Sequence, residues 1–124
     1  MKLTANLVSA CIVTAMAEGF VLAAKSGLDP TLVVEVLTER APIIGRAGSK
    51  VLAGDFSANF PLKLSHKDVQ LALAAARSAG VPVFSLAAVA QLQVAALAKG
   101  FGEQDQAATV QVLEEITGVK ARRR

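Results

Sequence analysis

The sequence has little of what strands, disulfides and metal sites require. Aromatic residues make up only 4% of the 124 residues, with no Trp and no Tyr, and there is one Cys and one His. Strands favour β-branched and aromatic side chains, whereas alanine and leucine, which supply most of the apolar residues here, suit helices. A single cysteine excludes an internal disulfide and a cysteine-rich metal site. We therefore expect an all-α chain that holds no metal.

The chain also lacks the charge pattern of a nucleic-acid-binding protein. The formal net charge is +3 at pH 7, and much of the excess lies in the last three residues, Arg122, Arg123 and Arg124. Elsewhere basic and acidic residues are interspersed, and no aromatic residues alternate with basic ones, as a base-stacking surface would require. We therefore interpret the terminal arginines as a solvated tail and expect no nucleic-acid partner.

Two apolar stretches raise the question of a membrane. Residues 78–98 carry no charge, but Gly80 and Pro82 interrupt the start of this stretch. The roughly 16 residues that follow are fewer than the ~20 that a bilayer-spanning helix needs. The N-terminal stretch reaches Glu18 and Lys25 too early to span. We predict that both stretches are buried helices of a cytoplasmic protein.

Prolines, glycines and capping residues divide the chain into about six helices. Residues 2–25 contain no proline and are apolar on nearly every side, which indicates a long helix surrounded by protein. Prolines at first helical positions, the acidic caps Asp29 and Asp105 and terminal glycines then predict further helices. These are expected at residues 30–40, 42–53, 65–79, 82–99 and 105–117. No strict alternation long enough for a strand is present.

The predicted helix at residue 65 has the sequence of a capping box. Ser65 is followed three residues later by Asp68, and such a pair satisfies the amide groups of a first helical turn. Lys67 between them is a cation at a helix N-terminus, where the helix dipole disfavours it. It therefore calls for an anionic partner, either Asp68 or a ligand phosphate. His66 is interpreted as a loop histidine, and Cys11 as a small hydrophobic residue of the first helix.

Lys2 and Asn6 form the first candidate site. They lie one turn apart on the predicted first helix, so both side chains leave the same stripe. A lysine and an amide there could act as a proton donor and a substrate-orienting group. They could instead be polar groups of a frayed terminal turn in water, and the spacing alone favours this second interpretation.

Several segments resemble one family in the order in which that family carries them. The runs that resemble the interdomain helix of the β-hydroxyacid dehydrogenases are residues 2–6, 17–23 and 26–28. The runs that resemble the C-terminal domain of the same family are residues 52–56, 60–64, 67–72 and 80–82. The family includes 3-hydroxyisobutyrate dehydrogenase, tartronate semialdehyde reductase and the glyoxylate/succinic semialdehyde reductases. The resemblance covers nearly the whole chain and implies a helical bundle like the C-terminal domain of 6-phosphogluconate dehydrogenase.

The resemblance also implies a role for each candidate residue. Lys2 takes the position of the general acid/base, and Asn6 that of the residue that hydrogen-bonds the substrate. Lys67 matches the lysine beside the nicotinamide cofactor, while Phe60 and Asp68 match residues that line or support the substrate cleft. The implied reaction is reversible hydride transfer between NADH or NADPH and a short semialdehyde or oxo acid.

The glycine-rich dinucleotide fingerprint with which the family begins is missing from these residues. We therefore expect residues 1–124 to form a single helical domain for substrate binding and dimerisation, with the N-terminal Rossmann domain absent. Such a chain should be inactive alone and should form a homodimer or a tetramer. The alternative is a homodimerisation module that has no catalytic role.

Overall fold

Helices account for the regular structure of residues 1–123, the part of the chain that the computed structural model describes. The elements are α1 (Lys2–Lys25), α2 (Pro30–Thr38), α3 (Pro42–Ala53), α4 (Leu62–Ala79), α5 (Phe84–Ala98), the 3-10 helix η1 (Gln106–Thr109) and α6 (Val110–Thr117). Within these residues there is no strand, and one isolated β-bridge joins Pro61 to Asp105. The prediction of an all-α bundle of about six helices is confirmed.

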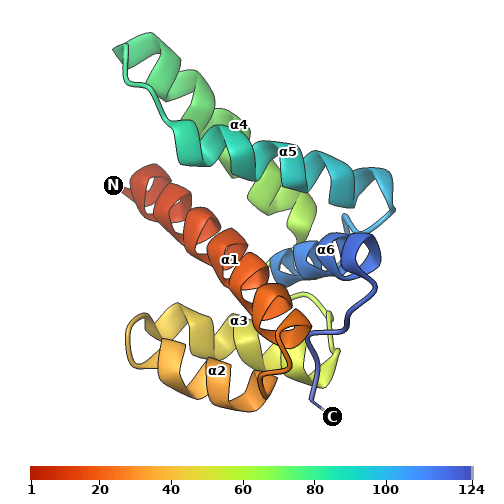
Figure 1. Cartoon of the computed structure of the whole chain (residues 1–124). Coiled ribbons are helices and arrows are strands. Elements are labelled where there is room, and N and C mark those ends of the chain that lie inside the picture. The colour runs from red at the N-terminus through yellow and green to blue at the C-terminus, as the bar shows by residue number, and fades with distance from the viewer. Residues whose placement is uncertain (124) are drawn as a thin grey trace.

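Helix α1 is the axis of the fold. It runs diagonally through the molecule, with α2 and α3 on one side and the α4–α5 hairpin on the other (Figure 1), and it packs against every other helix. Between Ala10 and Ala23 most of its side chains are buried, and Phe20 is fully enclosed. Its length and apolarity would also suit a membrane span. Of its most apolar stretch of 18 residues, 44% is buried inside the fold. The contacts on all sides agree with the prediction of a long buried first helix. The first two turns of α1 are more exposed than the remainder.

A close approach between α3 and its neighbours depends on a glycine. A Cβ atom at Gly48 would lie 3.2 Å from the ring of Phe20 and 3.2 Å from the Val34 methyl groups. Such contacts are tighter than a packed core accepts without movement. Gly48 therefore allows α3 to pack directly on α1 and α2.

The local signals for helix ends are confirmed at most positions. The Asp29 side chain accepts a hydrogen bond from the Thr31 amide at 2.9 Å, and Pro30 occupies the first turn of α2. Gly54 and Gly80 end their helices with left-handed φ angles of 65° and 68°, a conformation that glycine adopts without a Cβ penalty. These ends depend on neighbouring residues alone, which is why the sequence predicts them.

The predicted start of α4 at Ser65 is wrong. The helix begins at Leu62, whose amide donates to the Gln104 carbonyl at 2.8 Å. The Lys63 amide donates to the Gly102 carbonyl at 3.0 Å. Because a distant backbone segment satisfies these first-turn donors, no side chain is needed there. Ser65 is a buried helical residue, and Asp68 does not act as a cap.

The predicted start of α5 at Pro82 is also displaced, because the helix begins at Phe84. The Val81 amide donates to the Ala76 carbonyl at 2.9 Å, so this residue still belongs to the end of α4. Pro82 therefore lies in the connection between the two helices.

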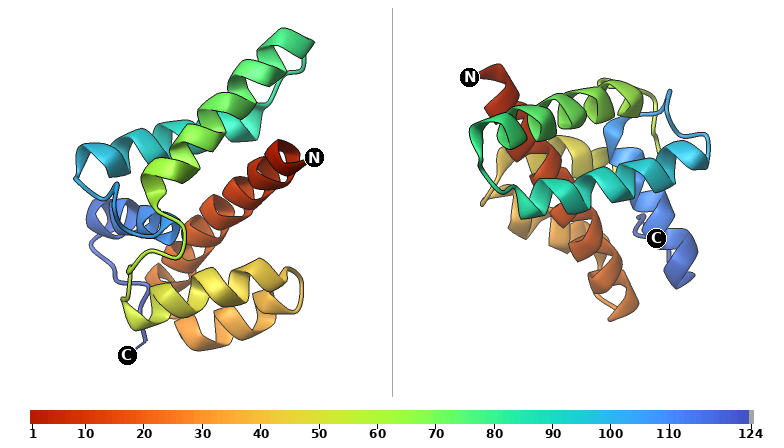
Figure 2. Two further views of the ribbon diagram at one scale, coloured as in Figure 1. Left: turned by 180° about the vertical axis from the view of Figure 1, so that it is seen from behind. Right: turned by 90° about the horizontal axis from the view of Figure 1, so that it is seen from above.

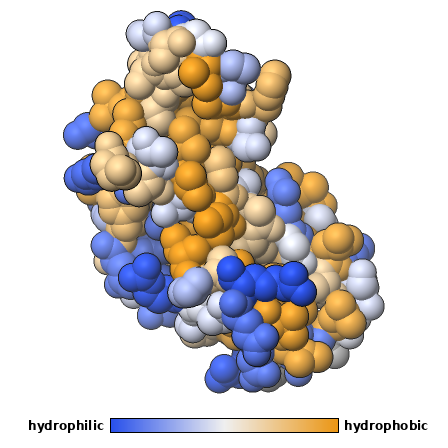
Figure 3. Space-filling model, turned by 90° about the vertical axis from the view of Figure 1, so that its left-hand side faces the viewer, coloured by the Kyte–Doolittle hydropathy of each residue, from blue (hydrophilic) through white to orange (hydrophobic). Residues whose placement is uncertain are grey.

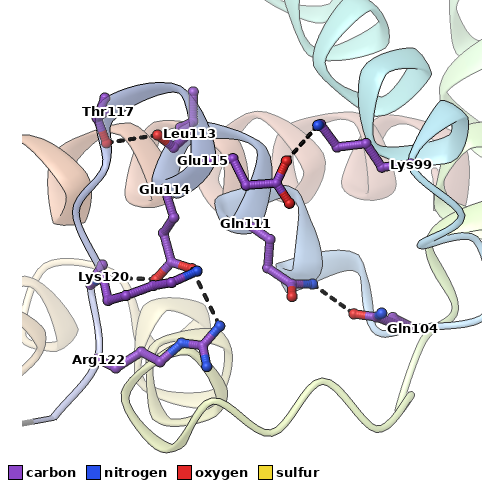
Figure 4. A network of polar contacts seen from close by, with 10 residues as sticks. Lys99, Gln104, Gln111, Leu113, Glu114, Glu115, Thr117, Lys120 and Arg122 are labelled. Atoms are coloured by element: carbon purple, nitrogen blue, oxygen red, sulfur yellow. Dashed lines mark hydrogen bonds and ion pairs between the residues drawn. The ribbon is translucent and has the colours of Figure 1, made fainter.

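The C-terminal segment up to Arg123 is held against the fold and is not the solvated tail that the sequence predicted. Glu114, fully buried on α6, accepts from the Ala121 amide at 2.8 Å and pairs with Lys120 and Arg122 at 3.3 and 3.4 Å (Figure 4). The Arg122 guanidinium also lies over the Phe56 ring, 5.7 Å from its centroid. The prediction failed because the sequence does not show that the buried Glu114 lies beside Arg122 in the folded chain. Arg124 lies outside the described residues.

Burial raises the pKa of the Cys11 thiol. Cys11 is half-buried against the cluster of side chains between α1, α4 and α5. Both observations agree with its interpretation as a small hydrophobic residue, because the reactive thiolate form is disfavoured.

Candidate functional site

A cleft of about 280 Å³ opens where α1, α3, the 55–61 segment and the first turns of α4 converge. The two views in Figure 2 show how α1 passes between the α2–α3 pair and the α4–α5 hairpin. The residues that line the cleft are Asn6, Ser9, Ile43, Arg46, Ala47, Lys50, Asn59, Phe60, Ser65, Asp68, Asp105 and Gln106. The volume is near the lower end of ligand sites in proteins, roughly 300–1,000 Å³, and suits a small molecule.

Asn6 and Asp68 join two walls of this cleft. The Asn6 Nδ2 donates to the Asp68 Oδ2 at 2.8 Å, and both residues line the opening. An amide group has two N–H donors and one carbonyl oxygen. The bond to Asp68 uses one donor and fixes the orientation of the amide, which leaves the Asn6 Oδ1 and one N–H for a ligand.

The structure brings together three of the five predicted site residues. Asn6, Phe60 and Asp68 line one cleft although they come from different parts of the sequence. Lys2 and Lys67 are exposed and are not among the lining residues. Lys2 lies one turn before Asn6 on α1, on the same stripe of the helix, and Lys67 precedes Asp68 on α4. Both lysines are therefore close in sequence to residues of the cleft but lie outside its lining.

Asp105 holds the segment that carries Phe60. It is 4% exposed, and its Oδ2 accepts from the amides of Asn59 and Phe60 at 3.0 and 3.1 Å. Its Oδ1 accepts from the Ala107 amide at 3.0 Å, which confirms its predicted role as a cap, here of η1. One carboxylate therefore fastens the 55–61 segment to η1 and fixes this side of the cleft.

Asp105→Ala is expected to destabilise the protein by about 2–3 kcal/mol, because it leaves three amide donors without their acceptor. Urea unfolding monitored by circular dichroism measures this loss. Asp55→Ala is the matched control, since Asp55 is exposed and accepts from one backbone amide, that of Ser57. Equal midpoints for the two variants would contradict the fastening role of Asp105.

A chain of polar side chains leads from the α4–α5 interface into the cleft. The His66 Nδ1 lies 3.1 Å from the Gln93 Oε1, and the Gln93 Nε2 donates to the Ser65 Oγ at 3.0 Å. The Ser65 Oγ in turn donates to the Gln106 Oε1 at 3.3 Å. His66 is therefore a helical residue with a buried partner and not a loop histidine. The visible signal for this chain was Gln93, a polar residue in a long uncharged stretch.

Sequence reasoning also missed the α3 wall. Ile43, Arg46, Ala47 and Lys50 all line the cleft. They are spaced as one face of a helix, so the sequence shows that they share a face but not that this face borders a cleft.

Comparisons with known proteins find similar sequences over most of the chain. Residues 1–113 match the family described as NAD-binding of NADP-dependent 3-hydroxyisobutyrate dehydrogenase. The chain is 32% identical over 123 residues to 2-(hydroxymethyl)glutarate dehydrogenase of Eubacterium barkeri, covering 96% of this chain and 41% of that protein. It is also 32% identical over 117 residues to the chloroplastic glyoxylate/succinic semialdehyde reductase 2 of Arabidopsis thaliana, covering 92% and 33%.

Solved structures agree on the fold. The 3-hydroxyisobutyrate dehydrogenase of Salmonella typhimurium superposes with a TM-score of 0.84 at 22% identity, covering 90% of this chain and 40% of that one. The Mycobacterium tuberculosis 3-hydroxyisobutyrate dehydrogenase, in a structure with L-serine, superposes with a TM-score of 0.80 at 26% identity, covering 90% and 42%. The chain thus spans less than half the length of the relatives it matches.

Proposed function

Because the chain belongs to the 3-hydroxyisobutyrate dehydrogenase family of NAD(P)-dependent oxidoreductases, we propose that it is the helical part of such an enzyme. The reaction is the interconversion of a short β-hydroxy acid and its semialdehyde. The observation that supports this most is the cleft in which Asn6 is oriented by Asp68, one helical turn from Lys2.

The size of the cleft limits how much of the cofactor it can hold. A volume of about 280 Å³ holds a small acid but not a whole dinucleotide. The residues present therefore fit contact with the nicotinamide end only, with Lys67 as the nearby exposed cation. The bound cofactor would supply or accept the hydride at the substrate carbon. A nucleotide-binding domain of the complete enzyme would hold the remainder of the cofactor.

The chain's own residues transfer the proton and bind and position the substrate. The Lys2 ammonium gives a proton to the carbonyl oxygen during reduction, and the resulting neutral Lys2 amine takes it back from the hydroxyl group during oxidation. Asn6 holds the same substrate through the amide groups that Asp68 leaves available. Phe60 forms an apolar part of the lining that restricts the position of the substrate. A positioned proton transfer of this kind contributes typically ~10²–10⁴-fold to a rate.

The experiment that tests this proposal is a reductase assay on the enzyme that combines this domain with a nucleotide-binding domain. Oxidation of NADH or NADPH is followed with short semialdehydes whose reduction gives a β-hydroxy acid, such as tartronate semialdehyde. We expect turnover with at least one of them and none with the isolated 124-residue chain. Absence of turnover with every semialdehyde and both cofactors would contradict the proposed reaction.

A second function, self-assembly, is favoured by exposed apolar side chains around the α4–α5 hairpin. Phe84 is 83% exposed, while Leu71 and Val81 are each about half exposed. Apolar atoms also gather in a band across the middle of the face shown in Figure 3. Large apolar side chains as exposed as these are candidates for contacts between proteins. We propose that the hairpin contributes to a homodimer, which could pair further into a tetramer.

Phe84→Asp is expected to convert the dimer into a monomer at micromolar concentration, because a carboxylate would then face apolar surface in the interface. Light scattering of the 124-residue chain measures the mass. Ile116→Asp is the matched control, since Ile116 is 75% exposed but lies on α6. A wild-type chain that remains a monomer would refute the proposal, as would a Phe84→Asp variant that remains a dimer.

A further inference from the structure

The charged residues that line the cleft balance one another. Arg46 and Lys50 on α3 are positive, whereas Asp68 and Asp105 are negative. Because these four side chains together carry no net charge, the lining does not select for an additional ionic group on a ligand. What the lining can distinguish is whether an uncharged substituent of the ligand forms hydrogen bonds.

Ser9 contributes an uncharged hydroxyl group to the lining. It lies three residues after Asn6 on α1, on the same side of the helix, and both residues line the cleft. Elsewhere Thr38, Ser49 and Thr117 donate their hydroxyl groups to the carbonyl four residues earlier in their helices. The Ser9 hydroxyl makes no such bond and has no other hydrogen-bond partner among residues 1–123. It can therefore donate to a ligand or accept from one.

Gln106 contributes an uncharged donor from η1. Its Oε1 accepts from the Ser65 Oγ at 3.3 Å. Ser65 is itself held by the buried Gln93, whose Nε2 donates to the Ser65 Oγ at 3.0 Å. This contact sets which end of the Gln106 amide faces Ser65. The Gln106 Nε2 donates to no residue within 1–123, so its N–H groups remain for a ligand in the cleft that Gln106 lines.

An apolar substituent would match this lining poorly. Of the twelve lining residues, three are apolar, namely Ile43, Ala47 and Phe60. A methyl group placed beside Ser9 and Gln106 would displace water from their polar groups and offer no hydrogen bond in exchange. Such a loss is unfavourable, and a site that hydrogen-bonds a hydroxyl group discriminates against the analogue that lacks it.

Resting on the proposed function, in which Lys2 and Asn6 act at the reacting carbon, we infer that the substrate carries a hydroxyl group on the next carbon. Gln106 donates to the oxygen of this hydroxyl group, and the Ser9 oxygen accepts its proton. Three residues of α1 correspond to a rise of about 4.5 Å, which one carbon–carbon bond and a hydrogen bond of about 2.8 Å together nearly cover. The preferred substrates are then a 2,3-dihydroxy acid and its semialdehyde.

The test uses two acids that differ only in this substituent. Glycerate carries a hydroxyl group on the carbon where 3-hydroxyisobutyrate carries a methyl group. Binding of each racemic acid to the 124-residue chain, without cofactor, is followed by amide chemical shifts in NMR. We expect glycerate to bind about three- to tenfold more tightly, because it adds hydrogen bonds that the methyl group cannot form.

Gln106→Leu and Ser9→Ala should each reduce this preference, and the two substitutions together should abolish it. Gln104→Leu is the matched control, because Gln104 has the same side chain as Gln106 but does not line the cleft. The glycerate preference should survive in this control. The amide spectrum of each variant also shows whether it is folded, and the Ser9→Ala variant tests the inference if Gln106→Leu does not fold.

Three results would overturn the inference: no binding of either acid at tens of millimolar, 3-hydroxyisobutyrate binding as tightly as glycerate, or a glycerate preference that survives both substitutions. Failure of the proposed reaction is separable from these results, because it is measured as turnover in the complete enzyme. The glycerate preference involves neither cofactor nor hydride transfer and is therefore measured independently.

Discussion

Glu114→Ala is expected to lower the free energy of unfolding by about 2–4 kcal/mol. The substitution leaves the Ala121 amide without its acceptor and removes the partner of Lys120 and Arg122. The loss should be smaller than for a fully buried ion pair, because the Lys120 and Arg122 side chains are 60% and 35% exposed. Since Arg122 covers the Phe56 ring and the Arg123 amide donates to the Leu52 carbonyl, the C-terminal segment should also detach from α3.

Chemical denaturation measures the stability, and amide hydrogen exchange at Ala121 measures the detachment. Glu115→Ala is the matched control on the same helix, because Glu115 is 46% exposed and pairs with Lys99 at the surface (Figure 4). Its loss should cost under ~1 kcal/mol. If the two variants unfold at the same denaturant concentration, Glu114 does not secure the C-terminal segment.

Lys2→Ala in the complete enzyme is expected to lower kcat for semialdehyde reduction by about 10²–10⁴-fold, because the carbonyl oxygen loses its proton donor. Cofactor affinity should stay nearly unchanged, since Lys2 is assigned to the substrate oxygen. Steady-state kinetics gives kcat, and fluorescence titration gives the dissociation constant of the cofactor.

Lys25→Ala is the matched control for this prediction, because Lys25 lies at the opposite end of α1 and donates to the Thr117 carbonyl at 3.0 Å. Its turnover should equal that of the wild type. Full activity of Lys2→Ala would remove the assignment of Lys2. A loss confined to cofactor binding would mean that Lys2 contacts the cofactor and does not transfer the proton.

Helix ends that depend on adjacent residues could be predicted from the sequence. Asp29 with Pro30 and the glycines at 54 and 80 act within one turn of the helices they start or end. The start of α4 could not be predicted in this way. Its first amides find acceptors near Gln104, some forty residues later, and no local pattern around Ser65 indicates that contact.

The candidate site could also be predicted only in part from the sequence. Asn6, Phe60 and Asp68 were identified through motifs of a family, and they do share one cleft. Arg46 and Gln106 were missed because hydrophobic periodicity identifies a helix but does not state which exposed residues border a cleft. Asp105 was predicted to cap a helix, but its hold on Phe60 spans 45 residues and appears only in the folded chain.

The measurement that tests the central claim most directly is the position of a bound hydroxy acid in a crystal structure of the complete enzyme. The claim is that the head of α1 presents an amine and an oriented amide to the substrate. We predict the Lys2 Nζ at hydrogen-bond distance, about 2.7–3.2 Å, from the reacting hydroxyl oxygen, with the Asn6 amide on the same molecule. A substrate bound in the cleft without either contact would contradict the claim.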